Sequence, residues 1–272
     1  MTARPALPDP NLHPQRFVRP NWLAVRALIR REILREIMFF KLALFGPALQ
    51  AILFALVFTL SVGSNVPMIG SLTLMQFLAP GLILSAAMHK AFETIGYSFV
   101  YDKTEMLLGD VFGAPITPAE ILLGYIATAC ISGVLLGVTV WLGLLPFGMI
   151  LPHDPLAAAY FAVAGIIIVG LLGMLAGIQS DRWDSISAKD IFIITPLSFL
   201  SCAFFPITAL SEPFQTIMVF NPLFHLIDGF RYAMTGQTDA QPAISAVIVF
   251  VILCALTFFC HRVLRSGYKI KQ

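Results

Sequence analysis

The side chains of this 272-residue sequence that could carry out chemistry are few and stand apart from one another. No glycine is followed by lysine, so the loop that holds nucleotide phosphates in P-loop ATPases is absent, and we do not expect the chain to hydrolyse ATP itself. The sequence has no His-Glu-x-x-His motif, and its five histidines lack the spacing of metal ligands. The four cysteines lie unpaired in apolar runs, as packing residues do. We therefore predict no catalytic residue, no metal site and no cofactor in this chain.

Two aspartates come closest to a catalytic pair. Asp102 follows Tyr101, and Asp110 follows Gly109, which superficially matches the paired motifs of intramembrane aspartyl proteases. Those proteases have a further glycine where Leu107 stands, and they place the two aspartates on separate spans. Here the aspartates lie eight residues apart in one segment, so a protease is not predicted.

The composition indicates an integral membrane protein. Hydrophobic residues make up 58% of the chain and charged residues 12%, against about 25% charged in an average soluble domain. Runs of about 20 mostly apolar residues, the length that crosses the hydrocarbon layer, occur at six places. They are 42–62, 72–98, 119–145, 156–180, 190–210 and 241–261. The predicted fold class is an all-α integral membrane protein with six transmembrane helices.

The basic residues predict the orientation of these spans. Fifteen of the 17 lysines and arginines precede the first span, follow the last, or lie in the loops 99–120 and 180–190. The loops 61–71 and 146–155 contain none, and the other two basic residues are Arg231 and a lysine inside a span. Because cytoplasmic loops carry the excess of lysine and arginine, both the N- and the C-terminus are predicted to be cytoplasmic.

The region before the first span has two parts. Residues 1–20 contain five prolines and no apolar signal core, and we expect a disordered cytoplasmic tail. In residues 21–37, an apolar stripe recurs at helical spacing after Asn21, which suits a helix cap; it consists of Trp22, Val25, Ile29, Ile33 and Ile37. We expect an interfacial amphipathic helix on the inner leaflet rather than a basic flank that only fixes orientation. Its arginines, expected to meet lipid head groups, are Arg26, Arg30, Arg31 and Arg35.

The segment 207–236 differs from a spanning helix. Its central apolar run is too short to cross the membrane, and Pro213 and Pro222 interrupt it. We expect a re-entrant outer hairpin of two short helices that dip into the outer leaflet before the last span. Asp228 and Arg231 are spaced i, i+3, so that they can pair and lower the cost of placing charge near lipid.

Charged residues also occur in the second predicted span. His89, Lys90 and Glu93 lie near its inner end, where a long side chain reaches the membrane surface. We expect Lys90 to pair with Glu93 in a structural role, and a contact with substrate is the alternative.

The inner loop 99–120 is a candidate contact for a soluble partner. It combines charged residues with five large apolar ones, which are Met106, Leu107, Leu108, Val111 and Phe112. A solvated connector would expose these apolar side chains to water, so we expect a short helix that docks into a groove. Phe112 is the expected anchor, and Asp110 is expected to orient the contact.

Three groups of residues resemble one known family. Met75–Leu82 (MQFLAPGL) resembles the start of its second span, and Asp110–Pro118 (DVFGAPITP) resembles its cytoplasmic acidic motif with Ala-Pro. The runs Phe205-Pro206-Ile207, Phe220-Asn221-Pro222-Leu223 and Asp228-Gly229-Phe230-Arg231-Tyr232 resemble its outer hairpin. Over roughly 20–270, the chain resembles the permease subunits of type-2 ABC exporters, particularly the small bacterial group of YadH-like and nodulation-factor permeases.

This resemblance implies partners and roles. It implies a type-2 ABC transmembrane domain over 21–272 in a bacterial inner membrane, present as a homodimer or a close heterodimer. Two copies of a separate ABC ATPase subunit would bind it and would hold the ATP and magnesium, and no nucleic acid is implied. The residues expected to couple the chain to that ATPase are Lys103, Glu105, Asp110, Phe112 and Pro115. Those expected to form the outer hairpin are Asn221, Pro222, Asp228 and Arg231.

The resemblance also implies the type of cargo, and it has one departure. Members of the family export lipid-linked glycans, polysaccharides, lipids and hydrophobic drugs, and the substrate passes outward between the two copies. The family usually has a basic residue shortly before the acidic one, where this chain has Glu105 and Met106. A secondary transporter is the alternative, although 38–140 and 150–262 show no convincing internal repeat. A membrane scaffold that transports nothing is the third possibility.

Overall fold

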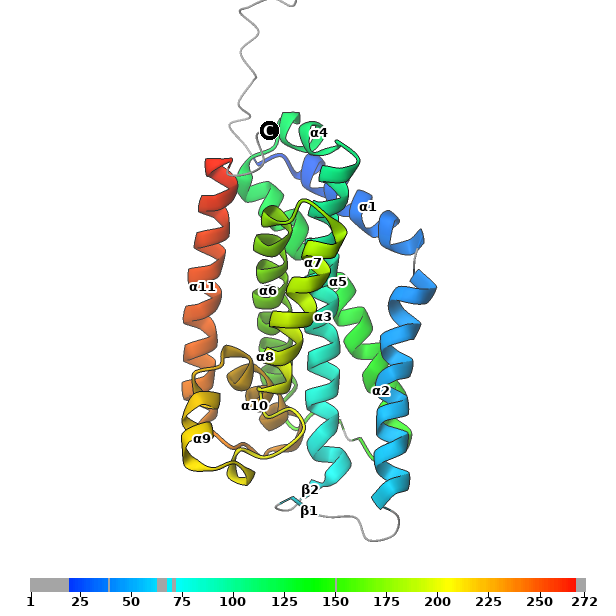
Figure 1. Cartoon of the computed structure of the whole chain (residues 1–272), viewed down its shortest axis with the longest axis vertical. Helices are drawn as coiled ribbons and strands as arrows, with labels where there is room; N and C mark the ends of the chain where they lie inside the picture. The colour runs from blue at the N-terminus through cyan, green and yellow to red at the C-terminus, as the bar shows by residue number, and fades with distance from the viewer. Residues whose placement is uncertain (1–19, 39, 63–67, 70–71, 150, 268–272) are drawn as a thin grey trace, which may run out of the picture.

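The computed structural model of the chain describes residues 20–38, 40–62, 68–69, 72–149 and 151–267. The tail predicted at 1–20 therefore lies outside the described residues, apart from its last position. Within them, long helices stand side by side, most of the shorter helices lie at the two ends of the bundle, and the helical segment 183–199 runs along its side (Figure 1). The described residues confirm the predicted all-α architecture.

The helices that run along the bundle are α2 (Phe40–Val62), α3 (Leu74–Thr104), α5 (Pro118–Leu144), α6 (Pro155–Gln179) and α11 (Pro242–Ser266). The shorter helices are α1 (Trp22–Met38), α4 (Leu108–Gly113), α7 (Trp183–Lys189), α8 (Thr195–Phe199), α9 (Glu212–Val219) and α10 (Pro222–Thr235). The remaining elements are the paired antiparallel strands β1 (Met68–Ile69) and β2 (Leu72–Thr73), a π-helical turn at Asp190–Ile194, and 3-10 turns at Leu145–Phe147 and Ile207–Ala209.

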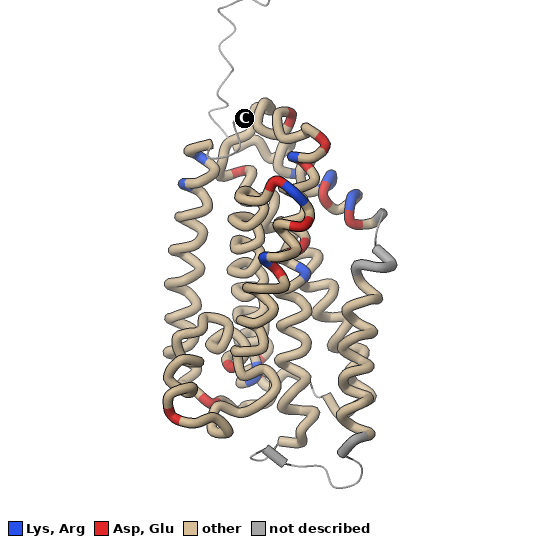
Figure 2. The backbone as a smooth tube through the Cα atoms, in the orientation of Figure 1, with Lys and Arg blue, Asp and Glu red and all other residues tan. Residues whose placement is uncertain are grey.

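The two ends of the bundle differ in charge. α1, α4 and the C-terminal end of α11 lie at one end, which we call the α4 end (Figure 1). α9 and the two strands lie at the other, the α9 end. Most of the charged residues gather toward the α4 end, and a smaller group lies near α9 and α10 (Figure 2).

The starts of the long helices follow ordinary capping chemistry. Thr73 and Thr117 begin α3 and α5 with capping boxes, in which each threonine and the residue three positions later satisfy each other's backbone N–H groups. Asp154 caps α6 by accepting from the backbone N–H of Leu156 at 3.0 Å. Proline occupies the first turn of α5, α6 and α11, where a backbone N–H is not needed.

Among the residues that the structure describes, three helices are long and apolar enough to cross a membrane by length and composition. They are α5 with its following turn (Pro118–Phe147), α6 and α11. Leu44–Leu60 of α2 is an apolar stretch of shorter length, and α3 has 31 residues but carries several charges. The count of six spans stays a prediction.

The prediction that the fifth span is one continuous helix over 190–210 is wrong. Helical structure begins earlier, at Trp183, and ends at Phe199, with a π-helical turn that ends two residues before Pro196. Proline has no backbone N–H and its ring crowds the preceding turn, which accounts for a local change of helix type at this point. The residues after α8 form bends and turns until Ile207.

α3 is the centre of the bundle and packs closely against α6. A Cβ atom at Gly173 would lie 2.5 Å from the Phe92 carbonyl oxygen, and one at Gly177 would lie 2.6 Å from that of Gly96. Glycine at these places lets the two backbones approach, as small residues do between membrane helices. α3 is thereby fixed as a rigid element that joins the two ends of the bundle.

Candidate coupling site

α1 is anchored where it begins. The Asn21 side chain accepts a hydrogen bond from the Ala24 backbone N–H at 3.1 Å, which is the predicted cap. The Asn21 backbone N–H donates to Glu120 Oε1 at 2.5 Å, and its side-chain amide donates to the Pro115 carbonyl at 3.2 Å. The start of α1 is therefore tied to the connection between α4 and α5.

The face of α1 that packs on the bundle differs from the predicted apolar stripe. Val25, Leu28 and the carboxylate-bearing Glu32 are buried, whereas Trp22 and Ile37 of the predicted stripe are exposed. The apolar spacing predicted the helix, but it did not indicate that a charged residue would lie on the buried side. Glu32 is one of the site residues that the sequence analysis missed.

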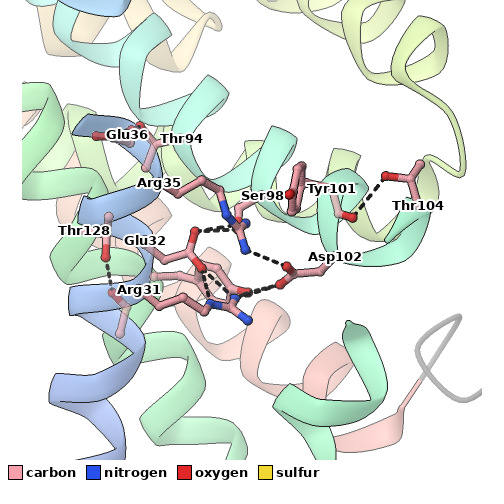
Figure 3. A network of polar contacts seen from close by, with 12 residues as sticks. Arg31, Glu32, Arg35, Glu36, Thr94, Ser98, Tyr101, Asp102, Thr104 and Thr128 are labelled. Carbon is pink, nitrogen blue, oxygen red and sulfur yellow. Dashed lines mark hydrogen bonds and ion pairs between the residues drawn. The ribbon is translucent and has the colours of Figure 1, made fainter. Parts of the chain in front are cut away.

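Glu32 belongs to a network of polar contacts between α1 and α3 (Figure 3). Arg31 Nη2 lies 2.6 Å from Glu32 Oε1 and 2.7 Å from Asp102 Oδ2. Arg35 Nη2 lies 2.9 Å from Asp102 Oδ1, and the Ser98 hydroxyl donates to Glu32 Oε2 at 2.6 Å. Two guanidinium groups thus neutralise two carboxylates, and Asp102 is fully buried.

The surrounding groups keep Arg31 charged. Burial by itself would lower the pKa of Arg31, but Glu32, Tyr125 and Asp102 outweigh it, so that the pKa is raised. The Tyr125 hydroxyl also contacts Asp102 Oδ2, at 3.4 Å, and brings α5 into the network. A buried carboxylate whose cations are removed is strongly destabilising. The network therefore holds α1 in one position on α3.

The four arginines of α1 fall into two pairs. Arg31 and Arg35 turn inward to Asp102, so the prediction that they meet lipid head groups is wrong for these two. The reason is the position of Asp102, which is buried directly beneath α1 and requires cations. Arg26 and Arg30 are exposed, and their contact with lipid head groups stays a prediction.

A second polar group joins the end of α1 to α3 and α5. Lys90 Nζ lies 3.2 Å from Glu36 Oε1, and the Thr94 hydroxyl donates to the same oxygen at 2.5 Å. The Ser132 hydroxyl donates to the other carboxylate oxygen of Glu36. The expected pairing of Lys90 with Glu93 is therefore wrong, because α1 supplies a carboxylate to this face of α3.

The loop predicted to dock into a partner is partly packed against its own bundle. Leu108 and Val111 of α4 are buried, and Phe112 packs on the same apolar cluster as Leu28 of α1. The expectation that all five apolar residues would otherwise face water is thus wrong. Met106 is the exception, because 88% of it is exposed. It also has a φ of +56°, a backbone conformation that bulky residues seldom adopt.

The other residues expected at the contact divide in the same way. Glu105, Asp110 and Pro115 are exposed at the α4 end. Lys103 instead turns inward, and its ammonium group donates to the carbonyl oxygens of Ile178 at 2.5 Å and Ser180 at 3.0 Å. These carbonyls lie at the C-terminal end of α6, where a cation is favourable. A direct partner contact by Lys103 does not fit this geometry.

At the α9 end, Asp228 and Arg231 lie inside the protein rather than beside lipid. Their charged groups are 3.7 Å apart, and Asp239 is 3.5 Å from the same guanidinium nitrogen. Arg231 donates to the carbonyl oxygen of Cys202 at 2.6 Å and to that of Phe77 at 3.3 Å. Burial raises the pKa of the Asp239 carboxyl, although Arg231 opposes this. Arg231 thus joins α10 to the start of α3 and to the chain after α8.

Asn221 holds the two short helices before the last long one. Its side-chain amide donates to the Leu197 and Leu200 carbonyl oxygens at 2.9 and 3.1 Å, at the end of α8. Its side-chain oxygen accepts from the Leu223 backbone N–H at 3.0 Å and so caps α10, with Pro222 in the first turn. The predicted pair of short helices is present as α9 and α10, whereas their depth in a membrane stays a prediction.

No group of three or more potential metal-ligating side chains occurs in the part of the chain that the structure describes.

Comparisons with known proteins agree with these features. The inner membrane transport permease YadH of Escherichia coli strain K12 is 26% identical over 251 residues, which cover 92% of this chain and 98% of that relative. Nodulation protein J of Rhizobium leguminosarum bv. viciae is 28% identical, covering 86% of this chain and 90% of that relative. The profile of the ABC-2 type transporter family matches residues 23–235. Because this match spans well over half of the chain, the protein belongs to the ABC-2 type transporter family.

Proposed function

We propose that the chain is the membrane permease of an ATP-driven exporter with six membrane spans and both termini in the cytoplasm. Membership of the ABC-2 family implies a transport component that works with an ABC ATPase. The proposed cargo is lipidic, glycan-linked or hydrophobic, and it leaves the cytoplasm or the inner leaflet. The proposed assembly has two permease copies and two ATPase copies, with the cargo passing between the permeases in a bacterial inner membrane.

The observation that carries this proposal is the connection between α4 and the buried charge network. α4 packs through Leu108 and Phe112 on the apolar cluster that also holds Leu28 of α1. α1 is in turn bound to α3 through Asp102. A force applied to α4 by a partner therefore reaches α1 and α3 through packed side chains, which behave as rigid contacts.

The exposed surface next to α4 supports a partner contact. Met106 extends from the turn between α3 and α4, and Glu105 and Asp110 lie exposed nearby. An exposed apolar side chain bordered by charges is typical of an interface anchor with an orienting rim. We assign the anchor role to Met106 in addition to the half-buried Phe112.

The test is reconstitution with the ABC ATPase encoded beside the permease. Both chains are co-expressed, purified through a tag on the permease and placed in proteoliposomes. We expect a complex whose ATP hydrolysis depends on the permease and whose transport stops without ATP. A secondary transporter would transport without the ATPase, and a scaffold would give no transport; either result would contradict the proposal.

A further inference from the structure

A pocket of about 340 Å³ lies between α1, α3 and α7, toward the α4 end. Its size is at the lower end of the range for pockets that bind small molecules. It lies beside the charge network, and Figure 3 shows several of its residues where α1 faces α3, among them Arg35, Glu36 and Tyr101. The residues important for the argument are Glu36, Lys90, Glu93, Tyr97, Tyr101 and Trp183.

The carboxylates that line the pocket outnumber the cations by one. Three carboxylates and two cations line it: Glu32, Glu36 and Glu93, and Arg35 and Lys90. Glu32 and Arg35 are held in the network with Asp102, and Lys90 pairs with Glu36. Glu93 forms no hydrogen bond or ion pair with any residue that the structure describes. The pocket therefore has one carboxylate more than it has cations, and that carboxylate is Glu93.

The groups next to Glu93 do not remove this excess. His89 contacts Asp190 of the π-helical turn at 3.4 Å, so a proton on His89 would be matched by that carboxylate. A carboxylate at membrane depth without a direct ion pair is costly, and such residues commonly belong to ligand sites. Glu93 is thus a candidate counter-ion for a bound cation.

Aromatic rings also line the pocket. The ring centroids of Tyr97 and Trp183 are 5.9 Å apart. The guanidinium of Arg35 already covers the Tyr101 ring at 4.4 Å, whereas Trp183 is 45% exposed and its ring remains accessible. Aromatic faces attract cations, and quaternary ammonium groups are bound in aromatic cages for this reason.

The position of Trp183 is fixed by the packing of α7. Ile186, one turn further along α7, is fully buried. It lies close to Gly96 of α3, because a Cβ atom added to Gly96 would be 3.1 Å from Ile186 Cδ1. The Tyr97 hydroxyl also contacts the Ser187 hydroxyl at 3.5 Å. Both aromatic rings are therefore held at the pocket before any ligand binds, which lowers the entropic cost of binding.

We propose that this pocket binds the cationic head group, an amine or quaternary ammonium, of an amphiphilic cargo. Glu93 acts as the counter-ion, and Tyr97 and Trp183 provide the aromatic walls, while the apolar tail stays in the bilayer. This proposal rests on the proposed transport function and names the chemistry of its substrate.

The test measures binding rather than transport. The full-length chain in phosphatidylglycerol nanodiscs is titrated calorimetrically with octyltrimethylammonium, octyl glucoside and octyl sulfate, which share one tail, and heats from empty nanodiscs are subtracted. We expect saturable binding of octyltrimethylammonium, about tenfold tighter than binding of octyl glucoside. Equal binding of the three amphiphiles, or tighter binding of octyl glucoside, would overturn the proposal, and the latter result would indicate a hydroxyl-rich head group.

Variants connect the binding to the pocket. Glu93→Gln is expected to weaken binding of octyltrimethylammonium by about tenfold, and Trp183→Ala by about threefold or more. Trp183→Phe keeps an aromatic face and should retain most of the affinity, and Glu212→Gln at the α9 end should change nothing. Because Trp183 is substantially exposed, its alanine variant should fold even if Glu93→Gln does not. Unchanged affinity in Trp183→Ala would overturn the proposal.

The binding result is separate from the test of the proposed function. A permease that forms its ATPase complex but binds no cation would overturn the pocket assignment alone. A permease that binds octyltrimethylammonium but has no ATPase partner would leave the pocket assigned and overturn the exporter.

Discussion

Asp102 of α3 lies with its Oδ2 atom 2.7 Å from Nη2 of Arg31, a residue 71 positions earlier in the chain. This contact and the matching one from Arg35 hold α1 against α3 at the end of the bundle where α4 lies. Because Asp102 is fully buried, the position of α1 depends on these two arginines.

Replacing Asp102 with alanine should lower the free energy of unfolding by about 3 kcal/mol, because Arg31 and Arg35 would lose their shared carboxylate. The value is at the low end of the usual range since the two arginine side chains are 32% and 21% exposed. Denaturant unfolding of the two proteins in detergent micelles measures this change in the free energy of unfolding. Arg26→Ala, on the exposed side of α1, should change stability by less than about 0.5 kcal/mol. Equal effects of Asp102→Ala and Arg26→Ala would contradict the network.

The two pairs of arginines on α1 should differ in their response to lipid. Replacing Arg26 and Arg30 with alanine should remove about 1 kcal/mol per residue of attraction to anionic lipid and leave the fold unchanged. Replacing Arg31 and Arg35 should instead weaken the fold in any lipid. The measurement is thermal stability with and without added phosphatidylglycerol. If both double variants lost the same lipid-dependent stabilisation, the inward position of Arg31 and Arg35 would be wrong.

Arg231→Ala should destabilise the α9 end by about 3–5 kcal/mol, because Asp228 and Asp239 would lose their cation and two carbonyl oxygens would lose a donor. Removing Asp228 as well should recover part of this loss. Arg231→Lys should not restore full stability, since an ammonium lacks the planar fork that reaches both carbonyls. Arg182→Ala, at an exposed position, is the control. A lysine variant as stable as the original would show that charge alone matters.

The predicted orientation can be tested by cysteine labelling. In a variant without the four native cysteines, a cysteine at Leu151 should react with a membrane-impermeant thiol reagent in intact spheroplasts. A cysteine at Gly109, beside α4, should react only after the membrane is opened. Both positions are exposed in the protein, so accessibility depends on the membrane. The opposite labelling pattern would reverse the direction of transport.

Local rules predicted the parts of the fold that depend on nearby residues. The cap at Asn21 follows from short-range spacing, and so does the interruption of 207–236 by Pro213 and Pro222. The pairing of Asp228 with Arg231 also lies within one helical turn. In each case the residues that interact are close in sequence, so that spacing alone indicates their relation.

The charge network was not predictable in the same way. Glu32 meets Ser98 across 66 residues, and Glu36 meets Ser132 across 96. These contacts depend on how α1 packs on the bundle, which apolar periodicity does not specify. The left-handed backbone of Met106 was also unexpected, because this conformation is normal for glycine and uncommon for methionine.

The most direct test of the account is whether the surface next to α4 binds the ATPase. In one double variant, Met106 is replaced by glutamate and Asp110 by alanine. The measurement is the amount of the neighbouring ATPase that co-purifies with the tagged permease in mild detergent. Because both side chains are exposed, the variant should fold and insert normally. A matched variant at the α9 end, Phe220→Glu with Glu212→Ala, controls for detergent and expression. We predict that the α4 variant loses at least tenfold of the bound ATPase while the control keeps it. Full retention of the ATPase by the α4 variant, together with unchanged export, would contradict the account.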